Sequence, residues 1–260
     1  MKLKNKVALI TGGGRGIGRA IALAFAEEGA DIAVAARTLA QVESVAQEIS
    51  SQSKVRTLPV ACDVSQVSSV EAMFQQVTEN LGREPDILVN NAGIAESAPL
   101  TKTNDELWQK HLAINLSGSF YCTRAALPAM ISRGWGRIIN IASIAGKTGA
   151  PYIAAYSASK HGLLGLTRST ALEFAAKGIT TNAICPGYVD TEMTSRGVEN
   201  ITKKTGRSAE EALAAIKKMS PQGRLVTSEE VAALALLLAS EVGGAINGQA
   251  INIDGGSVLF

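Results

Sequence analysis

Short runs of apolar, mostly β-branched residues alternate with longer amphipathic segments along almost the whole 260-residue chain. Such runs are typical of strands buried on both faces, and the longer segments repeat with the period of a helix. The predicted strands are residues 7–10, 31–36, 55–60, 86–89, 137–141, 180–184 and 250–253. The predicted helices are residues 17–28, 39–50, 67–81, 105–132, 154–176 and 229–239. This alternation predicts an α/β fold, a single doubly wound Rossmann-like domain over residues 1–260, with about seven parallel strands and helices on both faces.

Residues 188–227 interrupt the alternation. They carry a basic cluster around a short helical pattern at residues 208–219, for which Ser208 and Glu211 have the spacing of a capping box. An insertion of this length in a compact α/β domain is usually a lid or a substrate-binding element. The alternative for its charges is an ordinary solvated helix.

Composition and charge exclude several classes of partner. The net charge is only +2, and neither half of the chain has a basic block with interleaved aromatics, so we expect no nucleic-acid partner. The three cysteines are widely spaced and only two histidines accompany them, which argues against both a disulfide framework and a metal site. The N-terminal apolar run is too short for a signal peptide, and residues 231–239 make about half a membrane span. We therefore expect a cytoplasmic protein with no membrane partner.

A glycine-rich turn lies directly after the first predicted strand. Residues 11–18 read TGGGRGIG and open the first predicted helix, whose N-terminus offers free N–H groups and a positive dipole end to a pyrophosphate. The spacing fits T-G-x-x-x-G-x-G rather than G-x-G-x-x-G. The candidate cofactor-binding residues of the turn are Gly12, Arg15, Gly16, Ile17 and Gly18.

The end of the second predicted strand indicates which dinucleotide binds. A site that prefers NAD normally has an acidic residue here, to accept hydrogen bonds from the adenosine ribose. The chain instead has Arg37, and Arg15 in the glycine turn is a second cation directed to the same region. Two guanidinium groups favour the 2′-phosphate of NADP, and NADPH, over NAD.

Tyr156 and Lys160 are spaced by about one helical turn, so their side chains project from one helix face. An ammonium close to a phenol favours the phenolate, which would make the tyrosine a usable proton donor or acceptor. The pair alone is weak evidence, because Tyr and Lys at this spacing recur by chance.

The motifs together resemble the classical short-chain dehydrogenase/reductase family, and the resemblance covers nearly the whole chain. In chain order the motifs are TGGGRGIG, CDV (62–64), NNAG (90–93), Asn115 in AINLSG, Ser143 in NIASIAG, YSASK (156–160) and PGYVDT (186–191). Within the family the pattern is closest to 3-oxoacyl-carrier-protein reductases and polyketide-type ketoreductases.

The resemblance implies a role for each matching residue. Asn115, Ser143, Tyr156 and Lys160 would be catalytic: Tyr156 as the acid or base, Ser143 as a donor to the substrate oxygen, and Asn115 as a ligand of a water next to Lys160. Lys160 would also hold the nicotinamide ribose. The other implied cofactor-binding residues are Asp63, Val64, Asn91, Ala92, Gly93, Pro186, Gly187, Val189 and Thr191.

The expected activity is NADPH-dependent reduction of a ketone or a 3-oxoacyl thioester to a secondary alcohol. One alternative is the same site run oxidatively with NAD on a secondary alcohol or a 3-hydroxyacyl substrate. An alternative of another class is a dinucleotide-binding regulator without turnover, although such proteins usually lose one of the reacting residues. In this family the helices corresponding to 105–132 and 154–176 pair across a two-fold axis, and both carry surplus apolar residues here, so we expect a homotetramer.

Overall fold

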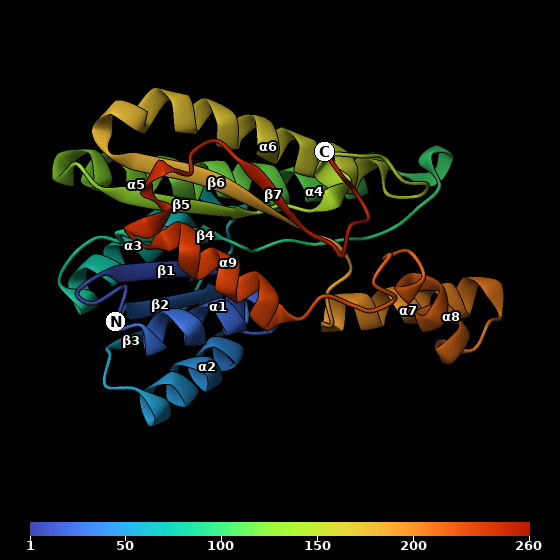
Figure 1. Ribbon diagram of the computed structural model, residues 1–260, viewed down its shortest axis with the longest axis horizontal. Coiled ribbons are helices and arrows are strands. Elements are labelled where there is room, and N and C mark those ends of the chain that lie inside the picture. Colours follow the sequence, from blue (N-terminus) through green and yellow to red (C-terminus); the bar gives the residue numbers. More distant parts are fainter.

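The computed structural model describes residues 1–260 and contains one parallel sheet of seven strands in the order β3-β2-β1-β4-β5-β6-β7 (Figure 1). The strands are β1 (Val7–Thr11), β2 (Asp31–Ala36), β3 (Thr57–Ala61), β4 (Ile87–Asn90), β5 (Gly136–Ile141), β6 (Ile179–Pro186) and β7 (Ala250–Ile253). The strand order reverses direction between β1 and β4, which confirms the predicted doubly wound sheet.

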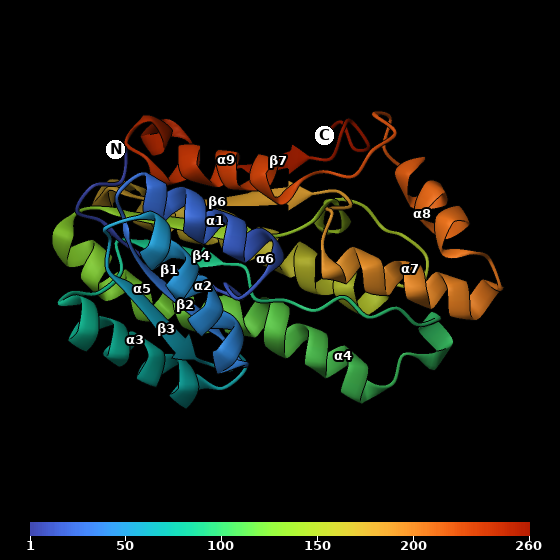
Figure 2. The ribbon, with the colours of Figure 1, turned by 90° about the horizontal axis from the view of Figure 1, so that it is seen from below.

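Helices cover both faces of the sheet (Figures 1 and 2). One face packs against α1 (Gly16–Glu27), α2 (Leu39–Gln52) and α9 (Ser228–Ala239) in a single hydrophobic core cluster. The other face packs against α3 (Val67–Leu81), α5 (Gly118–Arg133) and α6 (Ala154–Phe174). Short 3₁₀ turns lie at Leu100–Lys102, Ile144–Gly146, Ala175–Lys177 and Val242–Ala245. No helix has both the length and the apolar character that crossing a bilayer requires.

The helix predicted over residues 105–132 is present but is not a uniform α-helix. It consists of α4 (Asp105–His111), a π-helical segment (Leu112–Ser117) and α5. The apolar period of a sequence does not distinguish one wider turn from a regular helix, which explains why the pattern predicts a single helix. π-Helical turns occur often at functional sites, and Asn115 lies inside this one.

The segment after β6 contains two helices where the sequence pattern predicts one. The predicted helix is α8 (Ala209–Lys217), and its Ser208–Glu211 capping box is present. The helix before it, α7 (Glu192–Thr205), was not predicted, because its sequence is polar overall; it buries no residue. Figures 1 and 2 show α7 and α8 extending past the sheet on the side of the strand carboxyl ends.

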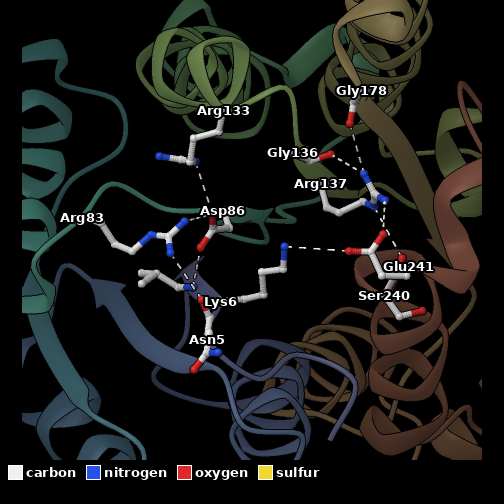
Figure 3. Close-up of polar contacts among 11 residues, drawn as sticks. Asn5, Lys6, Arg83, Asp86, Arg133, Gly136, Arg137, Gly178, Ser240 and Glu241 are labelled. Atoms are coloured by element: carbon white, nitrogen blue, oxygen red, sulfur yellow. Dashed lines mark hydrogen bonds and ion pairs between the residues drawn. The ribbon is translucent and has the colours of Figure 1, made fainter.

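At the opposite end of the sheet, where the strands begin, charged and polar side chains form a network (Figure 3). The buried Asp86 carboxylate accepts from the Val7 amide at 2.8 Å and from Arg83 at 2.6 Å. Arg137, also buried, donates to the carbonyl of Gly136 at 2.9 Å. These bonds satisfy main-chain and charged groups at strand starts, so this network stabilises the sheet.

Candidate active site

The carboxyl ends of β1 and β4 hold the glycine-rich turn in a close-packed position. Gly12 and Gly16 have φ of +64° and +52°, in the left-handed region that favours glycine. A Cβ on Gly12 would lie 2.8 Å from Asn91 Nδ2, and one on Gly18 would lie 2.4 Å from the Gly12 carbonyl oxygen. Any larger residue at Gly12 or Gly18 would therefore displace the backbone.

Asn91 braces this turn from the neighbouring strand end. Its Nδ2 donates to the carbonyls of Thr11 at 3.0 Å and Gly12 at 2.9 Å. The Thr11 hydroxyl in return accepts from the amides of Asn91 and Ala92 at 3.1 and 3.2 Å. The Asn91 side chain thus shapes the turn, and Thr11 is a supporting residue that sequence reasoning missed. Its place at the start of the TGGG string was the available signal.

The turn fits a dinucleotide pyrophosphate. The first turn of α1 has no side-chain cap at Arg15 and no acidic residue, so its N–H groups remain available to an anion. The backbone can be approached closely because Gly12, Gly16 and Gly18 have no side chains.

The two arginines of the proposed adenosine end differ in their surroundings. Arg37 is exposed just past β2 and forms no ion pair. Arg15 forms an ion pair with Glu192 at the start of α7, and Glu192 also pairs with Arg196. A 2′-phosphate would therefore meet a free guanidinium at Arg37, but would compete with a carboxylate for Arg15.

Asp63 and Val64 follow β3 as the CDV motif requires. One carboxylate oxygen of Asp63 accepts from the Ser65 amide at 3.0 Å and from the Ser65 hydroxyl at 2.7 Å. Val64 is buried, and a Cβ on Gly118 would lie 2.7 Å from its side chain. These contacts fix the direction in which the motif leaves the sheet.

Ser143, Tyr156 and Lys160 lie together beyond the carboxyl ends of β5 and β6. Ser143 caps a 3₁₀ turn, where its oxygen accepts from the Ala145 amide at 3.1 Å, so the cap does not use the hydroxyl proton. Lys160 is only 5% exposed, and its ammonium donates to the Ile141 carbonyl at 2.8 Å. Its Nζ lies 5.7 Å from the centroid of the Tyr156 ring, so the two side chains share one face of α6 as their spacing predicts.

The electrostatics of the pair differ from the sequence expectation that Lys160 lowers the pKa of Tyr156. Burial raises the pKa of Tyr156, and interaction with the Ser143 hydroxyl lowers it only in part. Burial also lowers the pKa of Lys160 from 10.5 to about 8. Both effects have one cause, since a desolvated pocket disfavours the phenolate and the ammonium alike.

Asn115 is fully buried, and its amide is occupied by the protein itself. Its Oδ1 accepts from the Ile94 amide at 2.9 Å. Its Nδ2 donates to the Ile94 carbonyl and to the Ser159 hydroxyl, each at 3.0 Å. Ser159 in turn donates to the Tyr156 carbonyl at 2.7 Å. The side chain therefore ties the loop after β4 to α6.

The segment after β6 closes over the glycine turn. The Gly187 amide donates to the Ile253 carbonyl at 2.9 Å, directly after Pro186 ends β6. Val189 is buried and pairs with Val226, and the Thr191 side chain would lie 3.2 Å from a Cβ on Gly16. The predicted cofactor residues of the glycine turn and of the segment after β6 are thus brought together.

Comparisons with known proteins place the chain in a family. The family model described as short chain dehydrogenase matches residues 6–202. D-beta-hydroxybutyrate dehydrogenase of Cupriavidus necator is 40% identical over 258 residues, 98% of this chain and 99% of that protein. 3-oxoacyl-(acyl-carrier-protein) reductase FabG of Aquifex aeolicus is 37% identical over 256 residues, 98% of each chain.

Among solved structures, a variant of actinorhodin polyketide ketoreductase with NADPH is similar, with a TM-score of 0.94, 39% identity and 98% of each chain covered. The chain belongs to the short-chain dehydrogenase/reductase family. It is an oxidoreductase of the CH–OH/C=O class, and the predicted resemblance to carrier-protein reductases and polyketide ketoreductases is confirmed.

Proposed function

We propose that the chain reduces a ketone or a 3-oxoacyl thioester to a secondary alcohol with NADPH, and that Tyr156 donates the proton. The observation that carries the proposal is the convergence of Ser143, Tyr156 and Lys160 beside a phosphate-binding turn. Bound NADPH supplies the hydride that reaches the carbonyl carbon. The protein's own groups align the carbonyl and manage the proton.

Each reacting residue has a role that its contacts permit. Ser143 donates its hydroxyl proton, which its cap does not use, to the substrate oxygen and orients it. Tyr156, whose pKa burial raises, stays protonated at neutral pH and gives its proton to that oxygen as the alkoxide forms. The nearby Lys160 ammonium then stabilises the phenolate left behind, 5.7 Å from the ring centroid. The proton is later restored from solvent, for which a water at the π-helical segment around Asn115 is the proposed route.

The cofactor would lie across the strand carboxyl ends. Its pyrophosphate would bind at Gly12, Gly16, Ile17 and Gly18, and its 2′-phosphate at Arg37 with Arg15. Asp63 and Val64 would hold the adenine, Asn91 to Gly93 the adenosine ribose, and Lys160 the nicotinamide ribose. Pro186, Gly187, Val189 and Thr191 would cover the nicotinamide.

The test is NADPH- and NADH-dependent turnover of a panel that spans acetoacetyl-CoA, acyl-carrier thioesters, aryl ketones and bicyclic diketones. We expect reduction of at least one member, with NADPH the better cofactor. A panel left untouched in both directions would contradict the proposal.

A second candidate is oxidation of a 3-hydroxyacyl or other secondary alcohol with NAD. It is favoured by the two hydroxybutyrate dehydrogenases among the relatives, at 40% and 38% identity, and by the ion pair that already engages Arg15. Higher kcat/KM for (R)- or (S)-3-hydroxybutyrate with NAD than for any ketone with NADPH would favour this reading.

Arg37→Ala should raise the KM for NADPH about 10-fold and leave the KM for NADH within about 2-fold, because a charge-assisted hydrogen bond to a phosphate is worth roughly 1.5–3 kcal/mol. The measurement is initial-rate kinetics with both cofactors. Arg56→Ala is the matched control. Arg56 is also an exposed arginine, but it pairs with Asp31 at the start of β2, whereas Arg37 follows the end of β2. A preference for NADP set by Arg37 is contradicted if NADH is the better cofactor and Arg37→Ala leaves the order of the two cofactors unchanged.

We also propose that the chain forms a homotetramer through α5 and α6. Leu163 and Leu164 are buried in the chain's own core and contribute nothing to such an interface. Leu172 on α6 is 84% exposed, and Phe120 and Ile131 are exposed on α5. Light scattering at micromolar concentration should give four times the chain mass; a monomer would refute the assembly.

The helices α7 and α8 are the proposed lid over the substrate. Lys204 near the end of α7 donates to the Ser97 carbonyl at 3.4 Å, and this bond links α7 to the loop after β4. Its neighbours Lys203 and Arg207 are exposed and suit the phosphates of an acyl-thioester substrate.

A further inference from the structure

His111 is a fully buried histidine at the end of α4, where neither of its ring nitrogens is free. Nδ1 lies 2.8 Å from the Leu107 carbonyl oxygen, and Nε2 accepts from the Glu96 amide at 3.1 Å. A carbonyl can only accept and an amide N–H can only donate. The two partners therefore assign the neutral ring with its proton on Nδ1.

The ring also contacts the proposed proton donor. The His111 and Tyr156 rings meet edge to face, with centroids 6.4 Å apart and planes at 74°. This lies within the range of a favourable aromatic contact. His111 thus bridges Tyr156 on α6 and Glu96 in the loop after β4.

That loop, residues 94–98, leads from the reacting groups to the proposed lid. It starts beside them, because a Cβ on Gly93 would lie 3.7 Å from Lys160 Nζ and 3.3 Å from Asn115 Oδ1. It then contacts the segment before α6 and helix α7. The Ala98 amide donates to the Tyr152 carbonyl at 2.9 Å, and the Ser97 carbonyl accepts from Lys204 of α7 at 3.4 Å.

Three residues of one helical stretch hold this loop. Asn115 binds both main-chain groups of Ile94, and Lys110 pairs with the Glu96 carboxylate at 2.7 Å. The Lys110–Glu96 pair is exposed and contributes little. The bond from the Glu96 amide to the buried His111 ring is the firm attachment at the middle of the loop.

We propose that His111 is a positioning residue, which sets loop 94–98 against Tyr156 at the reacting groups through its Nε2 bond to the Glu96 amide. It acts through the loop and need not touch the substrate. Only the kinetic part of its test rests on the proposed ketone reduction.

Two variants separate the Glu96 bond from the rest of the ring. His111→Gln places an amide near the position of Nε2 and can still accept from Glu96, whereas His111→Asn reaches only the position of Nδ1. Both remove the aromatic contact with Tyr156. We expect the KM for the ketone to rise about 10-fold in His111→Asn and less than about 3-fold in His111→Gln, the size of effect that one buried hydrogen bond produces. The KM for NADPH should change less than about 2-fold in both. Equal losses of kcat in the two variants would overturn the proposal and assign the effect to the ring contact.

The chain offers a matched control in His161. Its Nδ1 lies 2.9 Å from the Ser157 carbonyl, the same contact one turn back along a helix, but its ring is exposed. His161→Asn should leave the KM for the ketone unchanged. A rise equal to that of His111→Asn would count against a specific role for His111.

A second readout needs neither substrate nor cofactor. Hydrogen exchange of the Glu96 amide should be about 10-fold faster in His111→Asn than in the wild-type protein, and within about 3-fold in His111→Gln. Nitrogen NMR of the wild-type His111 ring should show a protonated Nδ1 and an unprotonated Nε2. Equal exchange in both variants would overturn the inference even if no ketone is reduced.

A second pair of variants is used if His111→Asn does not fold. Glu96→Pro, which lacks the amide proton, is compared with Glu96→Ala, which keeps it. Equal KM values for the ketone in these two variants would overturn the proposal.

Discussion

Tyr156→Phe should lower kcat for ketone reduction by about 10³-fold while the KM for the ketone changes only a few-fold, since general acid catalysis by a positioned side chain is worth about 10² to 10⁴-fold. The phenyl ring preserves the packing, including the edge contact with His111, and removes only the proton that the substrate oxygen requires. Steady-state kinetics with the best substrate of the panel gives both constants.

The matched control for this substitution is Tyr121→Phe. Tyr121 is a partly buried tyrosine on α5 that packs against the core and is no part of the proposed site. Its hydroxyl should be dispensable to within about 5-fold in kcat. If Tyr156→Phe keeps most of the wild-type rate, the assignment of the proton donor is wrong. A loss in Tyr121→Phe equal to that in Tyr156→Phe would mean that the loss does not report a specific role of the Tyr156 hydroxyl.

The sequence pattern predicted the sheet well, because a short run of apolar β-branched residues between two amphipathic helices is typical of a buried parallel strand. Helix α7 escaped prediction for the opposite reason. Its sequence is polar, contains Gly197 in its interior and buries no side chain. At its start Thr191 approaches Gly16 and Glu192 pairs with Arg15, and near its end Lys204 donates to the Ser97 carbonyl. Its few apolar residues recur with a helical period, but polar residues outnumber them, so the sequence pattern is typical of a loop.

The site was predictable where it depends on strand ends and helix faces. Ser143 follows β5, and Tyr156 with Lys160 share a face of α6, so the topology alone brings them together. The roles of Asn91 and His111 were not predictable. They depend on which main-chain groups in the glycine turn and in loop 94–98 come within hydrogen-bond reach, and a sequence does not record those distances. His111 does lie four residues before Asn115, on the same side of the helix, which was the one available signal.

Lys160→Met should remove nearly all activity and yet make the protein more stable at neutral pH. The activity should fall by at least about 10²-fold, because no cation then stabilises the Tyr156 phenolate or holds the proposed ribose. The stability gain follows from burial. Lowering the pKa of Lys160 from 10.5 to about 8 means that its charged form costs the folded state roughly 3 kcal/mol. Methionine keeps much of the packing but loses the bond to the Ile141 carbonyl, worth about 1 kcal/mol, so the expected net gain is about 2 kcal/mol.

The stability difference between Lys160→Met and the wild-type protein should depend on pH. The folded-state pKa lies below the unfolded one, so the cost of the buried ammonium is complete below about pH 8 and disappears as the pH rises toward 10.5. The advantage of Lys160→Met in denaturant unfolding should therefore shrink between about pH 8 and about pH 10 and then reverse, because only the lost hydrogen bond remains. Lys147→Met is the control: Lys147 also donates to a main-chain oxygen, that of Phe260 at 2.7 Å, but from a more exposed position. It should gain no stability at any pH. The prediction is wrong if Lys160→Met is less stable than wild type by the same amount at about pH 7 and about pH 10. The buried ammonium would then not destabilise the folded state, and its position beside Tyr156 would cost no stability.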